Sequence, residues 1–289
     1  GVQGQMDYSN YEIDFTAEGL RRVRAFSYIL GYSRRQYLRF VETEDFTTTV
    51  RQHIRAFECF KGLPATCLYD NTKVVVTGYD GEQPIYNTRF LAFATHYGFK
   101  PRACRLKRPQ TKGKIERPFW FVETNLLNAR TFSSLEHLNA TTEWWLDHVS
   151  DTHLHRETKQ RPIDRYQEEQ PYLLPLPAQH YDASEVVYRT VNSEGYVSYR
   201  GNFYSVPWQR IGDFLPLRIT ENELIVYGPD IAEMARHELL GLSTTGQKRS
   251  SESHRPGPDL RHKLEVLRQK FQELGPQALD RLHHQGSVE

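Results

Sequence analysis

The stretch LRRVRAFSYILGYSRRQYLRFVE, residues 20–42, decides the fold of this chain. Apolar residues run from Val23 to Leu30, a turn follows at Gly31-Tyr32-Ser33, and Tyr37 to Val41 resumes the extended pattern. Residues 1–8 have the same strand-like character. We therefore expect three strands that form an antiparallel meander at the start of the chain.

Helices and strands alternate after the meander. The expected elements are, in order, a helix over 46–60 that stops before Gly62-Leu63-Pro64, a strand over 65–69, a helix over 90–97 that ends at Gly98, a strand over 100–106 and a helix near Glu116. The order strand, strand, strand, helix, strand, helix, strand, helix is typical of an RNase H-like α/β domain. In an open sheet with helices on both faces, sites form at strand ends and adjoining helix starts.

The composition excludes several classes of protein. Of 289 residues, 38% are hydrophobic and 25% are charged, as in an ordinary globular protein. No run of about 18 apolar residues indicates a membrane span, and the first twenty residues lack the blocks of a signal peptide. Cys59, Cys67 and Cys104 are too few for a disulfide framework and too far apart for a Cys-x-x-Cys zinc site, so we expect reduced core thiols. We expect a cytoplasmic protein, associated with the nucleoid when bound to DNA, with no membrane partner.

The second half of the chain changes its periodicity. Pro171, Pro175 and Pro177 predict an extended linker. The strands expected beyond it, with a period of two, are 186–188, 196–199, 202–207, 215–219 and 224–227. These predict three domains: an α/β domain with a helical extension over 1–180, a small β-barrel over 181–242, and a flexible linker with a C-terminal amphipathic helix over 243–289.

Basic residues concentrate between Gly98 and Phe121. Eight cations surround a single acid, Glu116, although the whole chain has a net charge of only +1. A solvated loop is the ordinary explanation of such a run, but a solvated loop would normally carry balancing acids. A basic strip binds phosphates through counterion release. The strip therefore favours contact with nucleic acid.

Three acids, Asp7, Asp70 and Glu116, stand on the predicted first strand, at the end of the fourth strand and on the helix after the fifth. Carboxylates a few Å apart repel one another, so such a cluster stays ionised only beside a cation. Oxygen ligands without a nearby thiol or imidazole favour Mg²⁺, with Mn²⁺ as a substitute, and two ions suit an in-line phosphoryl transfer. Each acid also has a simpler explanation: a turn for Asp7 and Asp70, and a first-turn helix acid for Glu116.

An ordered set of motifs resembles the IstA transposases of bacterial insertion sequences, in the retroviral-integrase superfamily. The motifs are Gly1-Val2-Gln3-Gly4-Gln5-Met6-Asp7, Leu30-Gly31-Tyr32-Ser33-Arg34, Leu68-Tyr69-Asp70-Asn71-Thr72-Lys73, Asn87-Thr88-Arg89-Phe90 and Lys112-Gly113-Lys114-Ile115-Glu116-Arg117. The resemblance runs to about Leu240 and implies that Asp7, Asp70 and Glu116 are the catalytic triad. Tyr8 departs from the family, in which a tryptophan is expected. IstA proteins carry N-terminal DNA-binding domains, so the chain is interpreted as the catalytic core and C-terminal domains without that region.

The resemblance also bears on partners and on the choice between Asp7 and Asp14. It implies double-stranded DNA as substrate, an AAA+ ATPase helper of the IstB type, and a barrel that contacts DNA and neighbouring protomers. Catalysis on two DNA ends calls for a homo-oligomer, a dimer or larger. Asp14 has a strand-like context and competes as the first aspartate, but the Gln-x-Asp context and an extra hairpin in the family favour Asp7.

Further residues near the triad have expected roles. The residues expected to bind DNA are Asn71, Lys107, Arg108, Lys112, Gly113, Lys114 and Arg117. Trp120 and Phe121 are expected in the core, with base stacking as the less favoured alternative. His148, His153 and His155 lack the spacing of a zinc site. The predicted function is metal-dependent DNA strand cleavage followed by 3′-OH strand transfer. An RNase H-like nuclease without joining activity and a non-catalytic DNA-binding assembly module are the alternatives.

Overall fold

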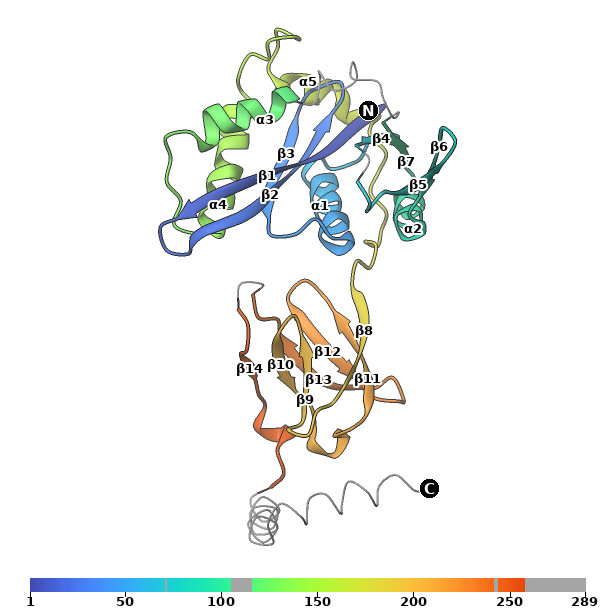
Figure 1. The fold of residues 1–289 in the computed structure, drawn as a ribbon. Helices are drawn as coiled ribbons and strands as arrows, with labels where there is room; N and C mark the ends of the chain where they lie inside the picture. The colour runs from blue at the N-terminus through green and yellow to red at the C-terminus, as the bar shows by residue number, and fades with distance from the viewer. Residues whose placement is uncertain (71, 105–115, 242–243, 258–289) are drawn as a thin grey trace, which may run out of the picture. The chain divides into compact units, whose positions relative to one another are not determined.

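The computed structural model describes residues 1–70, 72–104, 116–241 and 244–257, and the side chains of residues 116–118 lie outside this description. The chain divides into two compact units, Gly1–Ala183 and Ser184–Glu289 (Figure 1). Unit 1 combines a sheet with helices, which confirms the predicted α/β class.

A five-stranded sheet organises unit 1. Its strands are β1 (Gln3–Phe15), β2 (Gly19–Leu30), β3 (Gln36–Val41), β4 (Thr66–Tyr69) and β7 (Lys100–Ala103), in the spatial order β3-β2-β1-β4-β7. The first three strands are antiparallel, whereas β4 and β7 run parallel to β1. The predicted meander is confirmed, but β1 continues past residue 8 because Tyr11, Ile13 and Phe15 still pack against a core.

Helices cover both faces of this sheet. The helices are α1 (Phe46–Cys59), α2 (Thr88–Tyr97), α3 (Glu116–Val122), α4 (Leu135–Trp145) and α5 (Pro162–Glu169), with π-helical turns η2 (Glu123–Leu127) and η3 (Leu146–Ser150) after α3 and α4 and a 3-10 turn η4 (Gln170–Tyr172) after α5. The side chain of Asp45 caps α1 by accepting from the amide of Thr48. Gly98 ends α2 in the left-handed conformation, with φ of 77°.

The C-terminal half of strand β2 is buried on both of its faces, which explains its apolar sequence from Ala25 to Leu30, interrupted only by Ser27. Phe26, Tyr28 and Leu30 belong to a first core that includes residues of α1 and α2. Val23 and Ala25 belong to a second core that includes residues of α3 and α4. Because side chains alternate along a strand, even-numbered positions of β2 face the first core and odd-numbered positions face the second.

His53 of α1 lies at the centre of the first core and is fully buried. The ring centroids of Phe26, Tyr28, Phe57, Tyr69, Phe90 and Phe93 lie between 5.2 and 5.9 Å from its own. Its Nδ1 lies 2.7 Å from the carbonyl oxygen of Thr49, which can only accept, so Nδ1 carries the proton. Nε2 then accepts from the hydroxyl of Tyr69 at 3.1 Å. This hydrogen bond joins α1 to the last residue of β4.

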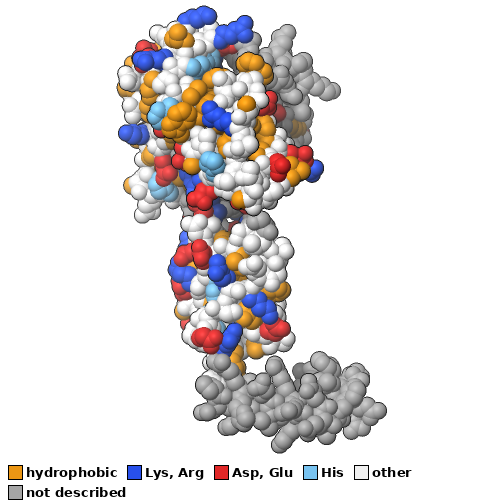
Figure 2. Space-filling view, turned by 90° about the vertical axis from the view of Figure 1, so that its left-hand side faces the viewer, with side chains coloured by type: hydrophobic (Ala, Val, Ile, Leu, Met, Phe, Trp, Pro, Cys, Tyr) orange, Lys and Arg blue, Asp and Glu red, His pale blue; other side chains and the backbone are white. Residues whose placement is uncertain are grey.

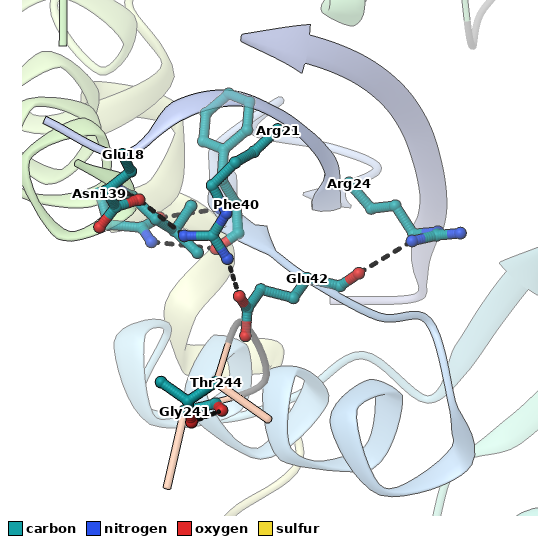
Figure 3. Close-up of polar contacts among 9 residues, drawn as sticks. Glu18, Arg21, Arg24, Phe40, Glu42, Asn139, Gly241 and Thr244 are labelled. Atoms are coloured by element: carbon teal, nitrogen blue, oxygen red, sulfur yellow. Dashed lines mark hydrogen bonds and ion pairs between the residues drawn. The ribbon is translucent and has the colours of Figure 1, made fainter. Parts of the chain in front are cut away.

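A buried asparagine docks α4 on the edge strand β3. Asn139 accepts from the amide of Phe40 and donates to its carbonyl, both at 2.9 Å, so its side chain pairs with β3 as a neighbouring strand would (Figure 3). Close by, Arg21 at the start of β2 forms ion pairs with Glu18 in the β1–β2 turn and with Glu42 just after β3.

A hairpin that the sequence did not indicate lies between β4 and α2. Its strands, β5 (Val76–Asp80) and β6 (Gln83–Tyr86), form a separate two-stranded sheet. The hydroxyl of Tyr86 accepts from the amide of Ala103 and donates to the carbonyl of Pro101, both at 3.2 Å. The hairpin therefore supplies hydrogen-bond partners to the edge strand β7.

Unit 2 consists of two sheets in its described residues. Its strands are β8 (Glu185–Thr190), β9 (Tyr196–Tyr199), β10 (Asn202–Ser205), β11 (Phe214–Ile219), β12 (Glu223–Tyr227), β13 (Glu233–Glu238) and β14 (Lys248–Arg249), with 3-10 turns η5 (Trp208–Arg210) and η6 (Glu252–His254). The sheets have the orders β13-β12-β11-β8 and β14-β10-β9, so the predicted closed barrel is not confirmed. They share one core, and Nε2 of His237 in β13 lies 2.7 Å from the carbonyl oxygen of Ser205 in β10.

The last predictions about the fold have mixed outcomes. Residues 248–249, in the predicted flexible linker, pair with β10 as β14. The predicted C-terminal helix falls in residues 258–289, outside the described part. Cys67 is buried as expected, whereas Cys59 is exposed. Within the described residues, no helix has the length and apolar character needed to cross a membrane.

Protonation of His53 should destabilise unit 1. Burial lowers the pKa of His53 from 6.5 to about 4, so an unfolded chain takes up this proton at a higher pH than the folded one. Stability is therefore retained above pH 6.5 and falls as the pH drops toward 4, by about 3 kcal/mol for this group. Urea unfolding at pH 7 and pH 4.5 measures the loss.

The control compares how much the free energy of unfolding changes between the two pH values in different variants. His53→Gln should have a smaller loss between the two pH values than the wild type, although it is less stable at pH 7. His148→Gln, which changes an exposed side chain, should keep the wild-type slope. An unchanged slope in His53→Gln would contradict a buried neutral imidazole.

Candidate active site

The register of three parallel strands brings Asp7 and Asp70 side by side. Met6 pairs with Tyr69, and Tyr69 pairs with Ala103, as the last partners of their ladders. The next residues along the three strands are Asp7, Asp70 and Cys104, and the amide of Cys104 extends the pairing by donating to the carbonyl of Tyr69 at 2.9 Å. Neighbouring strands lie about 4.8 Å apart. Two of the three predicted acids therefore meet at one edge of the sheet.

Both aspartates occupy positions on the same sheet face. Met6 and Tyr69 belong to the first core, with Ala103 packed against it, so the next position on each strand faces the opposite side. Asp7 is half-buried and Asp70 is exposed. The carboxylate of Asp7 accepts from the amide of Tyr8 at 2.8 Å.

Asp14 lies far from this edge. It pairs with Leu20 near the tip of the β1–β2 hairpin, whereas β4 pairs only with Gln3 to Met6. Seven residues of extended chain separate Asp14 from Asp7, a distance of about 23 Å at 3.3 Å per residue. The geometry thus groups Asp70 with Asp7 and not with Asp14.

A thiol beside the aspartates was missed in the sequence, where an all-oxygen site was expected. Burial raises the pKa of Cys104, and the negative charges of Asp70 and Asp7 raise it further. The thiol is therefore protonated at neutral pH, and a protonated thiol is a poor metal ligand. The donor set still favours a hard cation. Only the strand register reveals this neighbour, because Cys104 is distant from both acids in sequence.

Glu116 is the first residue of α3, on the element where the sequence placed it, but its side chain lies outside the described residues. Position 120 follows one helical turn later, so positions 116 and 120 share a helix face. Trp120 and Asp7 both line a cavity of about 500 Å³. Among the described residues, no three carboxylate, imidazole or thiol side chains form a complete metal site.

Most of the predicted DNA-binding residues cannot be placed. Asn71, Lys107, Arg108, Lys112, Gly113 and Lys114 lie outside the described residues, as does the side chain of Arg117. Lys100 and Arg102 of the basic strip are exposed on β7. Lys100, Arg102 and Cys104 follow one another at a spacing of two residues, so they share one sheet face, which is also the face of Asp70. Their spacing of two on a predicted strand was the signal that could have identified them.

Trp120 corrects a prediction about the core, since its side chain is 63% exposed. Phe121 is partly buried in the second core, and its ring stacks on His153 with centroids 4.6 Å apart. His148 stacks instead on the exposed Trp144, with centroids 4.9 Å apart. The three histidines in this region thus have aromatic and backbone partners.

Comparison with known proteins gives one family match and several relatives. Residues 176–245 match the family described as Mu transposase, C-terminal domain. The chain is 34% identical over 256 residues to the transposase for insertion sequence element IS21 of Pseudomonas aeruginosa, covering 88% of this chain and 65% of that protein. It is 36% identical over 202 residues to a putative transposase for IS5376 of Geobacillus stearothermophilus, covering 70% of this chain and 50% of that protein. The chain thus spans between half and two thirds of these two relatives.

Solved structures with a similar arrangement include retroviral proteins. The catalytic core domain of HTLV-2 integrase in complex with magnesium is 14% identical, covers 57% of this chain and 95% of its own, and has a TM-score of 0.43. A simian T-cell lymphotropic virus intasome chain is 14% identical, covers 81% of this chain and 74% of its own, and has a TM-score of 0.45.

The reactivity of Cys104 should report its two acidic neighbours. Asp7→Asn and Asp70→Asn each remove a negative charge, so each should lower the pKa of the thiol and raise its alkylation rate at pH 8 about two- to threefold. All variants also carry Cys59→Ser, which removes an exposed thiol. Iodoacetamide labelling followed by peptide mass spectrometry then measures the alkylation rate at Cys104. Asp14→Asn is the matched control and should leave the rate unchanged. Equal rates in all three variants would contradict the inferred row of residues.

Proposed function

We propose that this chain, which is similar over 88% of its length to the transposase for insertion sequence element IS21, is the catalytic core and C-terminal part of such a transposase. In this proposal unit 1 is an RNase H-like domain that cleaves DNA strands at transposon ends and transfers their 3′ hydroxyls into target DNA. The observation that carries the proposal is the juxtaposition of Asp7 and Asp70 on neighbouring parallel strands. The sheet order β3-β2-β1-β4-β7 supports the fold assignment.

Asp7, Asp70 and Glu116 are proposed to hold two Mg²⁺ ions, with Mn²⁺ as a substitute. Adjacent carboxylates on one sheet face repel each other, and a divalent cation relieves that repulsion. Bound ions would activate the attacking oxygen and stabilise the leaving one. The chain itself fixes the carboxylates in place: the parallel register sets Asp7 against Asp70, and the backbone amide of Tyr8 orients the carboxylate of Asp7.

Lys100 and Arg102 are proposed to bind DNA phosphates next to the triad. Both are exposed, and both lie on the face of β7 that leads to Cys104 and Asp70. The remaining cations of the strip follow directly in sequence and would extend this positive surface. Phosphate contacts of this kind position the duplex without reading its sequence.

The proposed partners follow from the relatives and from the reaction. Two transposon ends call for a homo-oligomer, a dimer or larger. An AAA+ ATPase of the IstB type is proposed for the choice of target DNA. Unit 2, which contains most of the match to the Mu transposase C-terminal domain, is proposed to contact DNA and neighbouring protomers.

Strand transfer should require all three acids. With pre-cut transposon ends and Mg²⁺, Asp7→Asn, Asp70→Asn and Glu116→Gln should each reduce joined products by at least about a thousandfold, since each removes a proposed metal ligand. Asp14→Asn is the control and should retain wild-type activity. Gel electrophoresis of labelled ends measures cleavage and joining separately. Hydrolysis without joined products would favour the nuclease alternative.

Metal binding has a second readout that does not depend on turnover. Mg²⁺ beside Asp7 and Asp70 should lower the pKa of Cys104 and accelerate its alkylation in the wild type, and Asp70→Asn should remove this acceleration. No effect of Mg²⁺ or Mn²⁺ on Cys104 would favour the non-catalytic DNA-binding module.

Two exposed cations should contribute to DNA affinity in a salt-dependent way. The double variant Lys100→Ala and Arg102→Ala should lower the slope of log K against log salt by about 2, because each lost phosphate contact contributes about 0.9. Fluorescence anisotropy with a duplex at several salt concentrations measures the slope. Arg22→Ala, an exposed cation on the β1–β2 hairpin, is the control. A slope equal to that of the wild type would contradict the proposed contact between β7 and DNA phosphates.

A further inference from the structure

The cavity that Asp7 lines continues away from the sheet edge toward α3 and the segment after η3. On the sheet side its lining includes Gln5, Asp7 and Gln36, and on the other side Trp120, His153 and His155. Its volume of about 500 Å³ is in the range of small-molecule sites. Hydrophobic, histidine and basic side chains lie next to one another on the surface over α3 and α4 (Figure 2).

Aromatic rings and an exposed aliphatic side chain dominate one wall. Phe121 and His153 stack on each other with an interplanar angle of 28°, so each ring covers part of the other. Trp120 and Leu154, which are 63% and 72% exposed, add two large apolar side chains in the same lining. Exposed apolar side chains that gather in one cavity are typical of a ligand-binding groove. An exposed aromatic ring such as that of Trp120 can bind a nucleobase by stacking, with little dependence on sequence.

The polar groups of the lining complement the edge of a base. Nδ1 of His153 lies 2.6 Å from the carbonyl of Ser150, so it carries the proton and Nε2 is an acceptor in the neutral ring. Nδ1 of His155 accepts from the amide of Glu157 at 3.3 Å, so in its neutral ring Nε2 is a donor. Arg34, which also lines the cavity, is a cation that suits a phosphate, and it forms an ion pair of 3.6 Å with Glu157 of the same lining.

We propose that this cavity receives an unpaired nucleobase of the DNA strand whose phosphate lies at Asp7 and Asp70, with Trp120 as the stacking residue. The inference rests on the proposed function, because Asp7 lines the cavity and also lies beside Asp70 at the sheet edge where the proposed triad meets. A nucleotide that leaves the duplex places its base on one side of the phosphate and fixes the phosphate's orientation. Trp120 is thus a positioning residue for strand cleavage and transfer.

The test uses the full chain, pre-cut end duplexes and three tryptophan variants. Trp120→Ala should reduce strand transfer about tenfold, the loss expected for one stacked base. Trp120→Phe should retain most activity because it keeps an aromatic ring. Trp144→Ala removes another exposed tryptophan, outside the lining of this cavity, and should behave as the wild type. Folding is preserved in each case because the substituted side chain is exposed.

Substrates with altered bases separate stacking from other effects. Single abasic sites are placed at each of the nucleotides that flank the scissile phosphate. At one position the abasic duplex should restore the activity of Trp120→Ala, because no base remains to be withdrawn from the duplex. With 2-aminopurine at that position and Ca²⁺ in place of Mg²⁺, binding of the wild type should change the fluorescence, and Trp120→Ala should diminish this change.

The outcomes distinguish the two proposals. Wild-type activity in Trp120→Ala, or a 2-aminopurine signal at no position, would overturn the base site and leave the transposase assignment intact. Absence of joined products in the wild type, together with a position-specific 2-aminopurine signal that needs Trp120, would retain the base site and overturn the strand-transfer function.

Discussion

The hydrogen bond between the buried imidazole of His53 and the hydroxyl of Tyr69 is the contact on which the arrangement of unit 1 depends. It fixes helix α1 against the last residue of β4, one position before Asp70. Six aromatic rings enclose the imidazole, so no water can replace a lost partner. The same strand is held on both sides by parallel pairing with β1 and β7. The packing of the core therefore also fixes the position of the proposed catalytic carboxylate of Asp70.

The edge that results has an unusual electrostatic composition. Two carboxylates and a protonated thiol stand in a row, and Lys100 and Arg102 are exposed on the same face of the sheet, on β7. Without a bound cation, the carboxylates make this edge repulsive to DNA phosphates, whereas Lys100 and Arg102 attract them. A divalent cation would therefore change the sign of the interaction at the acidic edge and leave the basic residues unaltered. Binding of DNA and binding of metal are expected to support each other.

Sequence periodicity predicted what depends on local pattern, and it failed where distant register decides. The meander, α1, α2 and the placement of Asp7 and Asp70 on their elements follow from apolar spacing and turn residues. That Cys104 is a neighbour of the aspartates depends on which residues pair across strands, and no local pattern states this. The family resemblance, and not periodicity, predicted Asp7 in preference to Asp14. The β5–β6 hairpin carries Gly78 and Pro84, which weaken a strand signal, and β14 has only two residues. Trp120 follows an apolar helical pattern, so only the packed structure shows that it faces solvent.

The row of Asp7, Asp70 and Cys104 also limits how relatives of this chain can diverge in length. One residue inserted or deleted between Gln3 and Asp7 would turn the aspartate toward the aromatic core, because successive strand residues face opposite sides. The same holds between Thr66 and Asp70. The turn at Gly81 carries no such requirement, because it lies at the tip of the separate β5–β6 hairpin. Insertions and deletions that accumulate during evolution should therefore avoid these two short strand segments and collect in turns of this kind.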